Sequence, residues 1–248
     1  MEKSFDGWLS GFIGVLIFSG SLPATRLAVM DFDPTFLTAA RAAIAGLLGI
    51  AMLLLFREKR PERGDLVSLA VVALGVVVGF PLLTALALKH VTSAHSIIFV
   101  GLLPLATAIF GVLRGGDRPR PGQRQAEGAR LSRKLGGWQV ICWALALSLP
   151  VMLALSFATL PPSFSAIGSS AWIGLGYVSL FSMLIGFVFW YRGLAQGGIA
   201  AVGQLQLLQP FFGLALAASL LHEQVSPLMV VVTLGVVACV FGAKKFAR

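Results

Sequence analysis

The sequence of 248 residues is 57% hydrophobic and 12% charged, with a mean hydropathy of +0.90. A soluble domain has about 25% charged residues, so this composition excludes a water-soluble globular protein. The formal net charge of +9 would suggest a nucleic-acid partner in a soluble protein, but here the basic residues lie between apolar runs. We therefore expect the lipid bilayer, and no nucleic acid, as the partner of this chain.

Long apolar runs recur along the whole chain. A hydrocarbon core about 30 Å thick needs about 20 apolar residues per helix, and a helix satisfies its backbone groups without water. The first run lacks a basic leader and a cleavage site, so it is expected to be retained as a span. The runs predict an all-α integral membrane protein with about eight transmembrane helices, at residues 7–29, 34–56, 66–88, 92–113, 138–158, 170–191, 199–221 and 226–243.

The distribution of basic residues predicts the orientation of these helices. If the N-terminus is cytoplasmic and the spans alternate, 16 of the 19 Lys and Arg residues lie on the cytoplasmic side. Only Arg26, Arg41 and Lys89 lie at or near the opposite face. Since short cytoplasmic loops are rich in Lys and Arg, we predict a multi-pass protein of the cytoplasmic (inner) membrane with both termini inside.

An internal similarity links the two halves of the chain. The spans that match cross in opposite directions, which predicts an inverted repeat, the architecture of many secondary transporters. We therefore divide the chain into a first repeat at 1–113, a basic cytoplasmic loop at 114–137 and a second repeat at 138–248. A shift of 106 residues places Leu88 on Leu194, Ala94 on Ala200, Leu102 on Leu208, Pro104 on Pro210 and Asp117 on Glu223.

Several short motifs follow one another in a recognisable order. The motifs are Ser21-Leu22-Pro23-Ala24-Thr25-Arg26, Arg41 with Ala42-Ala43-Ile44-Ala45, Ala87-Leu88-Lys89-His90-Val91-Thr92-Ser93-Ala94, Leu103-Pro104, and Gln209-Pro210 through His222-Glu223 to Gly235. In their order and spacing the chain resembles the drug/metabolite transporter superfamily, in its EamA-like branch of bacterial exporters.

The chain departs from that family in one region. The resemblance implies ten spans, built as two inverted five-helix repeats. Here the 24 residues from Arg114 to Gly137 contain no apolar run long enough to cross. We interpret the chain as a truncated form of the ten-helix fold that lacks the fifth and most of the sixth helix, with the splice near Gly122 to Gln125.

The resemblance implies a secondary transporter that exports small metabolites, amino acids or related compounds, by alternating access. The alternative is a truncated, transport-inactive homologue that inserts and pairs with another chain, for example as a homodimer. None of the ten acidic residues is central in a span, so no carboxylate is placed to relay protons. No metal-binding or nucleophile motif occurs, so we predict no enzyme activity and no cofactor, with a membrane transferase as a third, weaker alternative.

Arg41 is the leading candidate for substrate binding. It lies about seven residues inside the second span, roughly 10 Å from its start. In one interpretation it reaches the outer face or pairs with Asp31, Asp33 or Glu223. In the other it binds a carboxylate of the substrate.

The remaining candidates are amides, aromatic residues and one histidine. Three glutamines crowd the seventh span, where they either bond between helices or contact substrate. The aromatic residues either form a wall or anchor helices at the interface, and the histidine is either structural or lines a cavity. The predicted substrate-binding residues are Arg41, His95, Phe99, Tyr177, Trp190, Gln204, Gln206 and Gln209.

Overall fold

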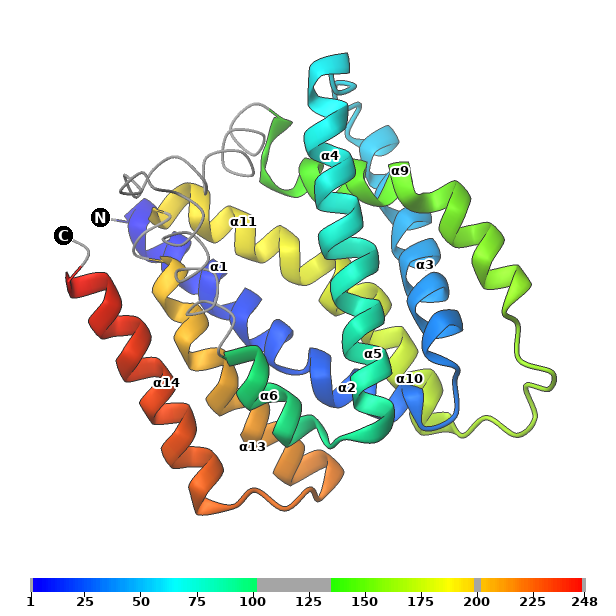
Figure 1. The fold of residues 1–248 in the computed structure, drawn as a ribbon. Helices are drawn as coiled ribbons and strands as arrows, with labels where there is room; N and C mark the ends of the chain where they lie inside the picture. Colours follow the sequence, from blue (N-terminus) through cyan, green and yellow to red (C-terminus); the bar gives the residue numbers. More distant parts are fainter. Residues whose placement is uncertain (1, 102–134, 199–201, 247–248) are drawn as a thin grey trace, which may run out of the picture.

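The computed structural model describes residues 2–101, 135–198 and 202–246, and the regular elements in these ranges are all helices (Figure 1). Six helical segments are long and apolar enough to cross a membrane, and they match six of the predicted spans. The fourth predicted span begins with α6 (Ser93–Gly101) and continues outside the described residues. The eighth coincides with α14 (Pro227–Phe246), of which Pro227–Ala238 is a shorter apolar helix. The six segments are Phe5–Val29, Pro34–Leu55, Arg63–His90, Gly137–Ala158, Ser169–Gly197 and Gly203–Leu221.

Several spans are built from consecutive helical elements of different type. The first span consists of α1 (Glu2–Ser19) and α2 (Ser21–Val29), and the second is α3 (Pro34–Leu55). The third contains α4 (Leu66–Val72), the π-helix η2 (Ala73–Gly79) and α5 (Phe80–His90). In the second half, α9 (Gly137–Ala158) precedes α10 (Ser169–Tyr177), the π-helix η3 (Val178–Ile185) and α11 (Gly186–Gly197). The 3₁₀-helix η4 (Gly203–Leu208) leads into α13 (Gln209–Leu221).

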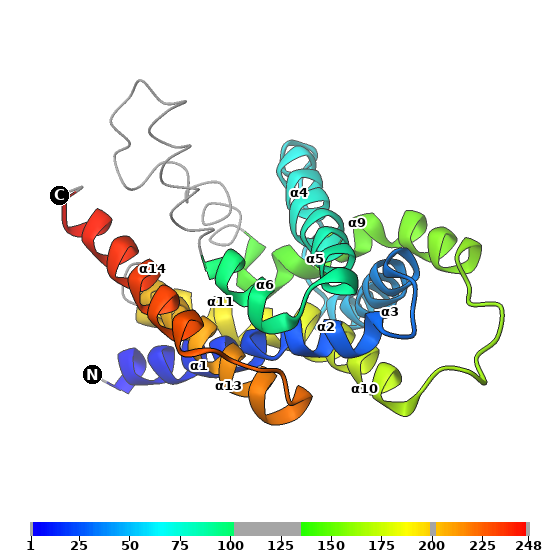
Figure 2. The same cartoon turned by 60° about the horizontal axis from the view of Figure 1, so that its bottom comes forward.

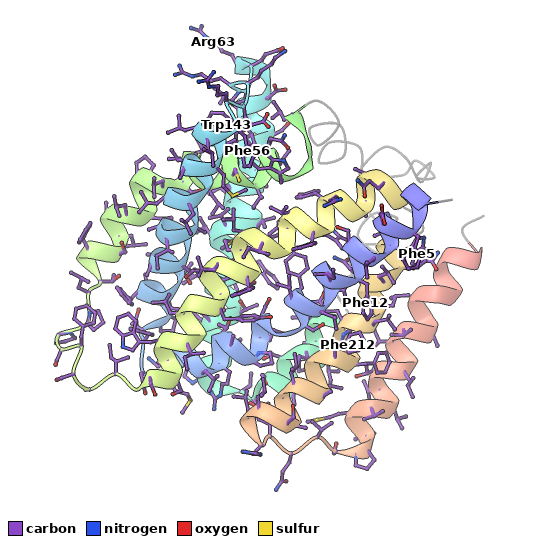
Figure 3. The ribbon with its side chains drawn as sticks, turned by 180° about the vertical axis from the view of Figure 1, so that it is seen from behind. Phe5, Phe12, Phe56, Arg63, Trp143 and Phe212 are labelled. Carbon is purple, nitrogen blue, oxygen red and sulfur yellow. The ribbon has the colours of Figure 1, made fainter. Side chains whose placement is uncertain are left out.

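The connections between spans gather on two opposite sides. In Figure 1 the turns after α2, α5, α9 and α13 lie along the lower and right side. The two termini and the turn between α3 and α4 lie on the upper and left side. Figure 3 places Arg63 at the far end of the third span, beyond Phe56 and Trp143, so the charged end follows an aromatic zone typical of a membrane interface.

The first span and α11 are in backbone contact. A Cβ atom added to Gly193 would lie 2.6 Å from the Cα atom of Gly11, and one added to Gly14 would lie 3.0 Å from the backbone nitrogen of Trp190. Small residues permit this approach, and it allows van der Waals contact along the whole helix pair. On the other side of α1, Phe12 meets Phe212 of α13 edge to face, with ring centroids 5.8 Å apart (Figure 3).

The two π-helices lie at equivalent positions of the internal repeat. A shift of 106 residues carries Arg63–His90 onto residues 169–196, and the observed span is Ser169–Gly197. The same shift carries η2 onto residues 179–185, and η3 is Val178–Ile185. These two spans run in opposite directions in Figure 1. Because π-helical turns are rare, their match supports an inverted repeat by evidence independent of residue identity.

The equivalent faces of these two spans differ in burial. Gly186, Trp190 and Gly193 of α11 are buried against α1. Their equivalents in α5, 106 residues earlier, include Phe80 and Ala87, both of which the described residues leave exposed. In the apolar window of the third span 22% of the residues are buried. In the corresponding window of its counterpart, Ser169–Gly197, 44% are buried. In Figure 2, α4 projects away from the other helices. The third span therefore has an apolar face without a described helix against it.

The contact between α1 and α11 predicts the effect of one added methyl group. In Gly193→Ala the new Cβ atom would meet the backbone of Gly11, so we expect a destabilisation of about 1–3 kcal/mol. The matched control is Gly176→Ala in α10, where nothing lies within 4 Å of the added atom. Thermal unfolding in detergent should show a lower Tm for the first variant only. Equal Tm values would contradict the close packing.

Candidate functional site

Arg41 carries its charge into the interior of the helix bundle. Its side chain is 5% exposed, in the middle of the buried face of α3. The Nη2 atom lies 3.4 Å from the Oγ atom of Ser182 in η3, to which it can donate a hydrogen bond. The Ser182 hydroxyl lies 2.8 Å from that of Ser21 in α2. The Nε atom of Arg41 is buried and has no hydrogen-bond partner among the described residues.

The structure places Arg41 away from the partners that one of its two interpretations requires. At 5% exposure the guanidinium does not reach the outer surface. Asp31 accepts a hydrogen bond from the backbone of Gly168 at 2.8 Å, and Asp33 caps α3 by accepting from Thr35 at 2.8 Å. Glu223 is also engaged elsewhere, as described below. The pairing of Arg41 with Asp31, Asp33 or Glu223 is therefore wrong, and so is its extension to the outer face.

The backbone is irregular where Arg41 and Ser182 meet. The first span breaks at Gly20, between α1 and α2. The Tyr177 hydroxyl donates to the Ile17 carbonyl at 2.7 Å, and its ring lies so close to Gly20 that an added Cβ atom would be 2.8 Å from Cζ. Opposite this break lies the π-helix that carries Ser182. Broken helices and π-turns near the middle of a span are common at ligand sites of transporters and other proteins.

Two of the predicted site residues, Arg41 and Tyr177, lie at this irregular region. Tyr177 also stacks on Phe181, with ring centroids 5.5 Å apart. The two serines that complete the region, Ser21 and Ser182, were not among the predicted site residues. Their signal in the sequence is weak, because a single hydroxyl in an apolar helix usually bonds to its own backbone.

The other candidates lie elsewhere. Trp190 is 8% exposed and packs against Gly14 in the contact of α1 with α11. His95 is exposed at the start of α6, with Nδ1 2.7 Å from the hydroxyl of Thr92, and Phe99 is 71% exposed. Gln204 and Gln206 are exposed and Gln209 is half-buried, all on η4 and the start of α13. The structure does not bring these six residues to Arg41.

Glu223 and Arg26 form hydrogen bonds on the side of the molecule that carries the turns after α2, α5, α9 and α13. Glu223 accepts hydrogen bonds from the backbone nitrogens of Ser93 and Ala94 at 3.0 and 2.8 Å, and from the Ser93 hydroxyl at 2.8 Å. These bonds cap the first turn of α6. Arg26 donates to the carbonyl of Leu88 near the end of α5. Both residues therefore have structural partners.

Two apolar grooves of the structure have linings that do not include Arg41. One of about 220 Å³ lies between α3 and α9 and is lined mainly by aliphatic and aromatic side chains, including Phe36 and Phe157. Another, of about 540 Å³, lies along α9 around Pro150. None of the predicted site residues lines either groove. Arg41 itself is buried among the described residues.

A known family of transporters covers nearly the whole chain. The EamA-like transporter family matches the chain twice, over residues 6–126 and 127–243. The chain belongs to this family. The boundary between the two matches lies within the predicted basic loop at 114–137. Membership confirms the resemblance found in the sequence and makes the chain a membrane transporter.

A similar protein is known from Bacillus subtilis (strain 168). The chain is 61% identical to its "Uncharacterized transporter YdeK" over 287 aligned residues, which cover 100% of both chains. No solved structure matches the chain.

Proposed function

We propose that this chain is a secondary transporter that exports small metabolites, amino acids or related compounds, by alternating access. The observation that carries the proposal is the Arg41 guanidinium, buried beside a broken helix and a π-helix and left with an unpartnered Nε atom. A buried charge is costly unless it is paired. A substrate carboxylate is the natural counter-charge for this site.

The repeat supplies the parts that alternating access needs. Two repeats of opposite direction form a site between them, and rocking of one repeat against the other opens it to each side in turn. The site lies where α2, α3 and η3 meet, so it joins helices of both halves. The break at Gly20 and the π-helix leave the backbone able to bend there. Arg41 would hold the substrate while these segments move.

Transport of labelled amino acids and related acids in sealed vesicles tests this proposal. We expect Arg41→Ala to lower the flux about tenfold or more at equal protein level, because a hydrogen bond to a charged group contributes about 1.5–3 kcal/mol. We also expect Gln206→Ala to lower it, since an exposed amide within a span is costly unless it meets substrate or water.

Arg192→Ala is the matched control, because that arginine is exposed on α11. Its flux should remain close to that of the unchanged chain. Unchanged flux in both Arg41→Ala and Gln206→Ala would remove these residues from the transport path.

We further propose that both termini are cytoplasmic, in the cytoplasmic membrane. The support is the excess of basic residues on the side that carries the termini and the turn between α3 and α4. In a chain without Cys142 and Cys239, a membrane-impermeant maleimide applied to intact cells should label Ser163→Cys and leave Lys59→Cys unlabelled. The reverse pattern would invert the orientation.

A second candidate function, a truncated homologue that pairs with another chain, is favoured by the exposed face of the third span. Shifting the first span by 106 residues gives 111–135, most of which falls in the basic stretch that holds no long apolar run. The chain has 39 residues fewer than the 287 positions aligned with the Bacillus relative. As helix, 39 residues would span about 59 Å, enough for about two crossings.

Supplying the missing helices tests this alternative. We expect the chain alone to insert but to transport several-fold less than the Bacillus relative, because no described helix covers the face around Ala87. Co-expression of the relative's extra segment as a separate peptide should raise the flux, and the peptide should co-purify with the chain. Ala87→Trp, which places a bulky ring on that face, should block both effects. Flux from the chain alone equal to that of the relative would show the segment to be dispensable.

A further inference from the structure

The site around Arg41 has unused hydrogen-bond donors. Its side chain is 5% exposed, and the Nε atom has no partner among the described residues. Among the described residues, the guanidinium makes one hydrogen bond, to Ser182, and its length of 3.4 Å is near the upper limit for such a bond. Because a guanidinium has five N–H donors and no acceptor, most of its capacity is available to an anion.

The acceptors nearby are already used by hydroxyl groups of the protein itself. A carbonyl that a broken or π-helical segment frees could otherwise have received an ammonium group from a substrate. Here the Ile17 carbonyl accepts from Tyr177 at 2.7 Å and the Ser21 carbonyl from Thr25 at 2.6 Å. The buried polar atom that has no described partner at this site is a donor, the Nε atom of Arg41, so the site favours an anion.

In the part of the chain that the structure describes, the hydrogen bonds at Arg41 and Ser182 involve hydroxyl groups and no carboxylate that could meet an ammonium group. The three acidic residues that were candidate partners of Arg41 are Asp31, Asp33 and Glu223. They accept hydrogen bonds from backbone N–H groups instead. A cationic substrate group would therefore enter the bundle unpaired, at a high desolvation cost.

Resting on the proposed function, we propose that the substrate of this transporter is a monoanion with one carboxylate and no ammonium group, bound by Arg41 with help from Ser182. One negative charge neutralises the guanidinium. A second negative charge, or a zwitterion's ammonium group, would remain uncompensated in a low-dielectric site. The substrate class is thus the deaminated relatives of amino acids and similar monocarboxylates.

The charge of Arg41 also affects the relative rates of exchange and net efflux. Without an anion, the bare guanidinium would have to cross the bundle while the repeats rearrange. That step costs more than the same step with a neutral ion pair. We therefore expect exchange of one monocarboxylate for another to be faster than net efflux.

Two pairs of compounds that differ by one ammonium group test the substrate class. They are 3-phenylpropionate with L-phenylalanine, and 4-methylpentanoate with L-leucine. The measurement is the Tm of the purified full-length chain as each compound is titrated at constant ionic strength, since a ligand of the folded state raises Tm. We expect at least one of the two ammonium-free acids to raise Tm, with a Kd at least tenfold lower than that of its amino acid.

Variants assign the effect to the site. We expect Arg41→Gln to weaken the binding of the acid at least tenfold, in line with the loss of a charge-assisted hydrogen bond. Ser182→Ala should weaken it several-fold. Ser179→Ala is the matched control, because this buried serine of the same π-helix bonds to Leu175 and not to Arg41. If Arg41→Gln does not fold, the comparison of the two serine variants still tests whether the acid binds at Ser182.

Three results would overturn the proposal. They are an equal or larger shift with the amino acids, a shift that persists in Arg41→Gln or falls equally in both serine variants, and no shift with either acid. Flux in liposomes separates this inference from the proposed function. Arg41-dependent binding of a monocarboxylate without any flux would contradict the proposed transport function but agree with the proposed substrate class. Flux of amino acids without binding of the monocarboxylates would contradict the substrate class but agree with the transport function.

Discussion

The backbone contact between the first span and α11 determines where the other groups of the site lie. Because Gly11 and Gly193 carry no side chain, the two helices approach until their backbones touch. This approach brings the break at Gly20 against the ring of Tyr177 and places the π-helix η3 beside α2. The hydroxyls of Ser21 and Ser182 then meet at 2.8 Å, and Arg41 reaches them from α3. A larger residue at the glycine contact would separate these groups.

Through the internal repeat, the contact between the first span and α11 predicts how the equivalent face of the third span would pack. The third span shares with its counterpart its length, its register and its π-helix. Among the described residues, no helix lies on Phe80 and Ala87 as α1 lies on α11. An apolar face exposed to lipid costs little, so such a face is compatible with insertion. Coupled motion of a repeat is more demanding, because it needs contacts that hold the repeat together.

Charge is used sparingly inside this protein. At the ends of the spans, carboxylates cap helices or join turns, as Asp33 and Glu223 do. Within the bundle, Arg41 has hydroxyl groups as its described neighbours. Such an arrangement stabilises the protein less than an ion pair would, and it leaves the charge available to a ligand.

The sequence by itself determined the membrane class, most of the spans, the register of the repeat and the family. These depend on hydropathy, on charge and on order along the chain, which need no knowledge of neighbours. It also identified Arg41, because a charge within an apolar run stands out at any position. Tertiary structure alone decided that Arg41 meets Ser182, that Trp190 packs against Gly14, and that the glutamines of η4 lie elsewhere. The helices are apolar on every side, so their sequence does not specify which face meets which neighbour, and only packing selects the partners of each polar group.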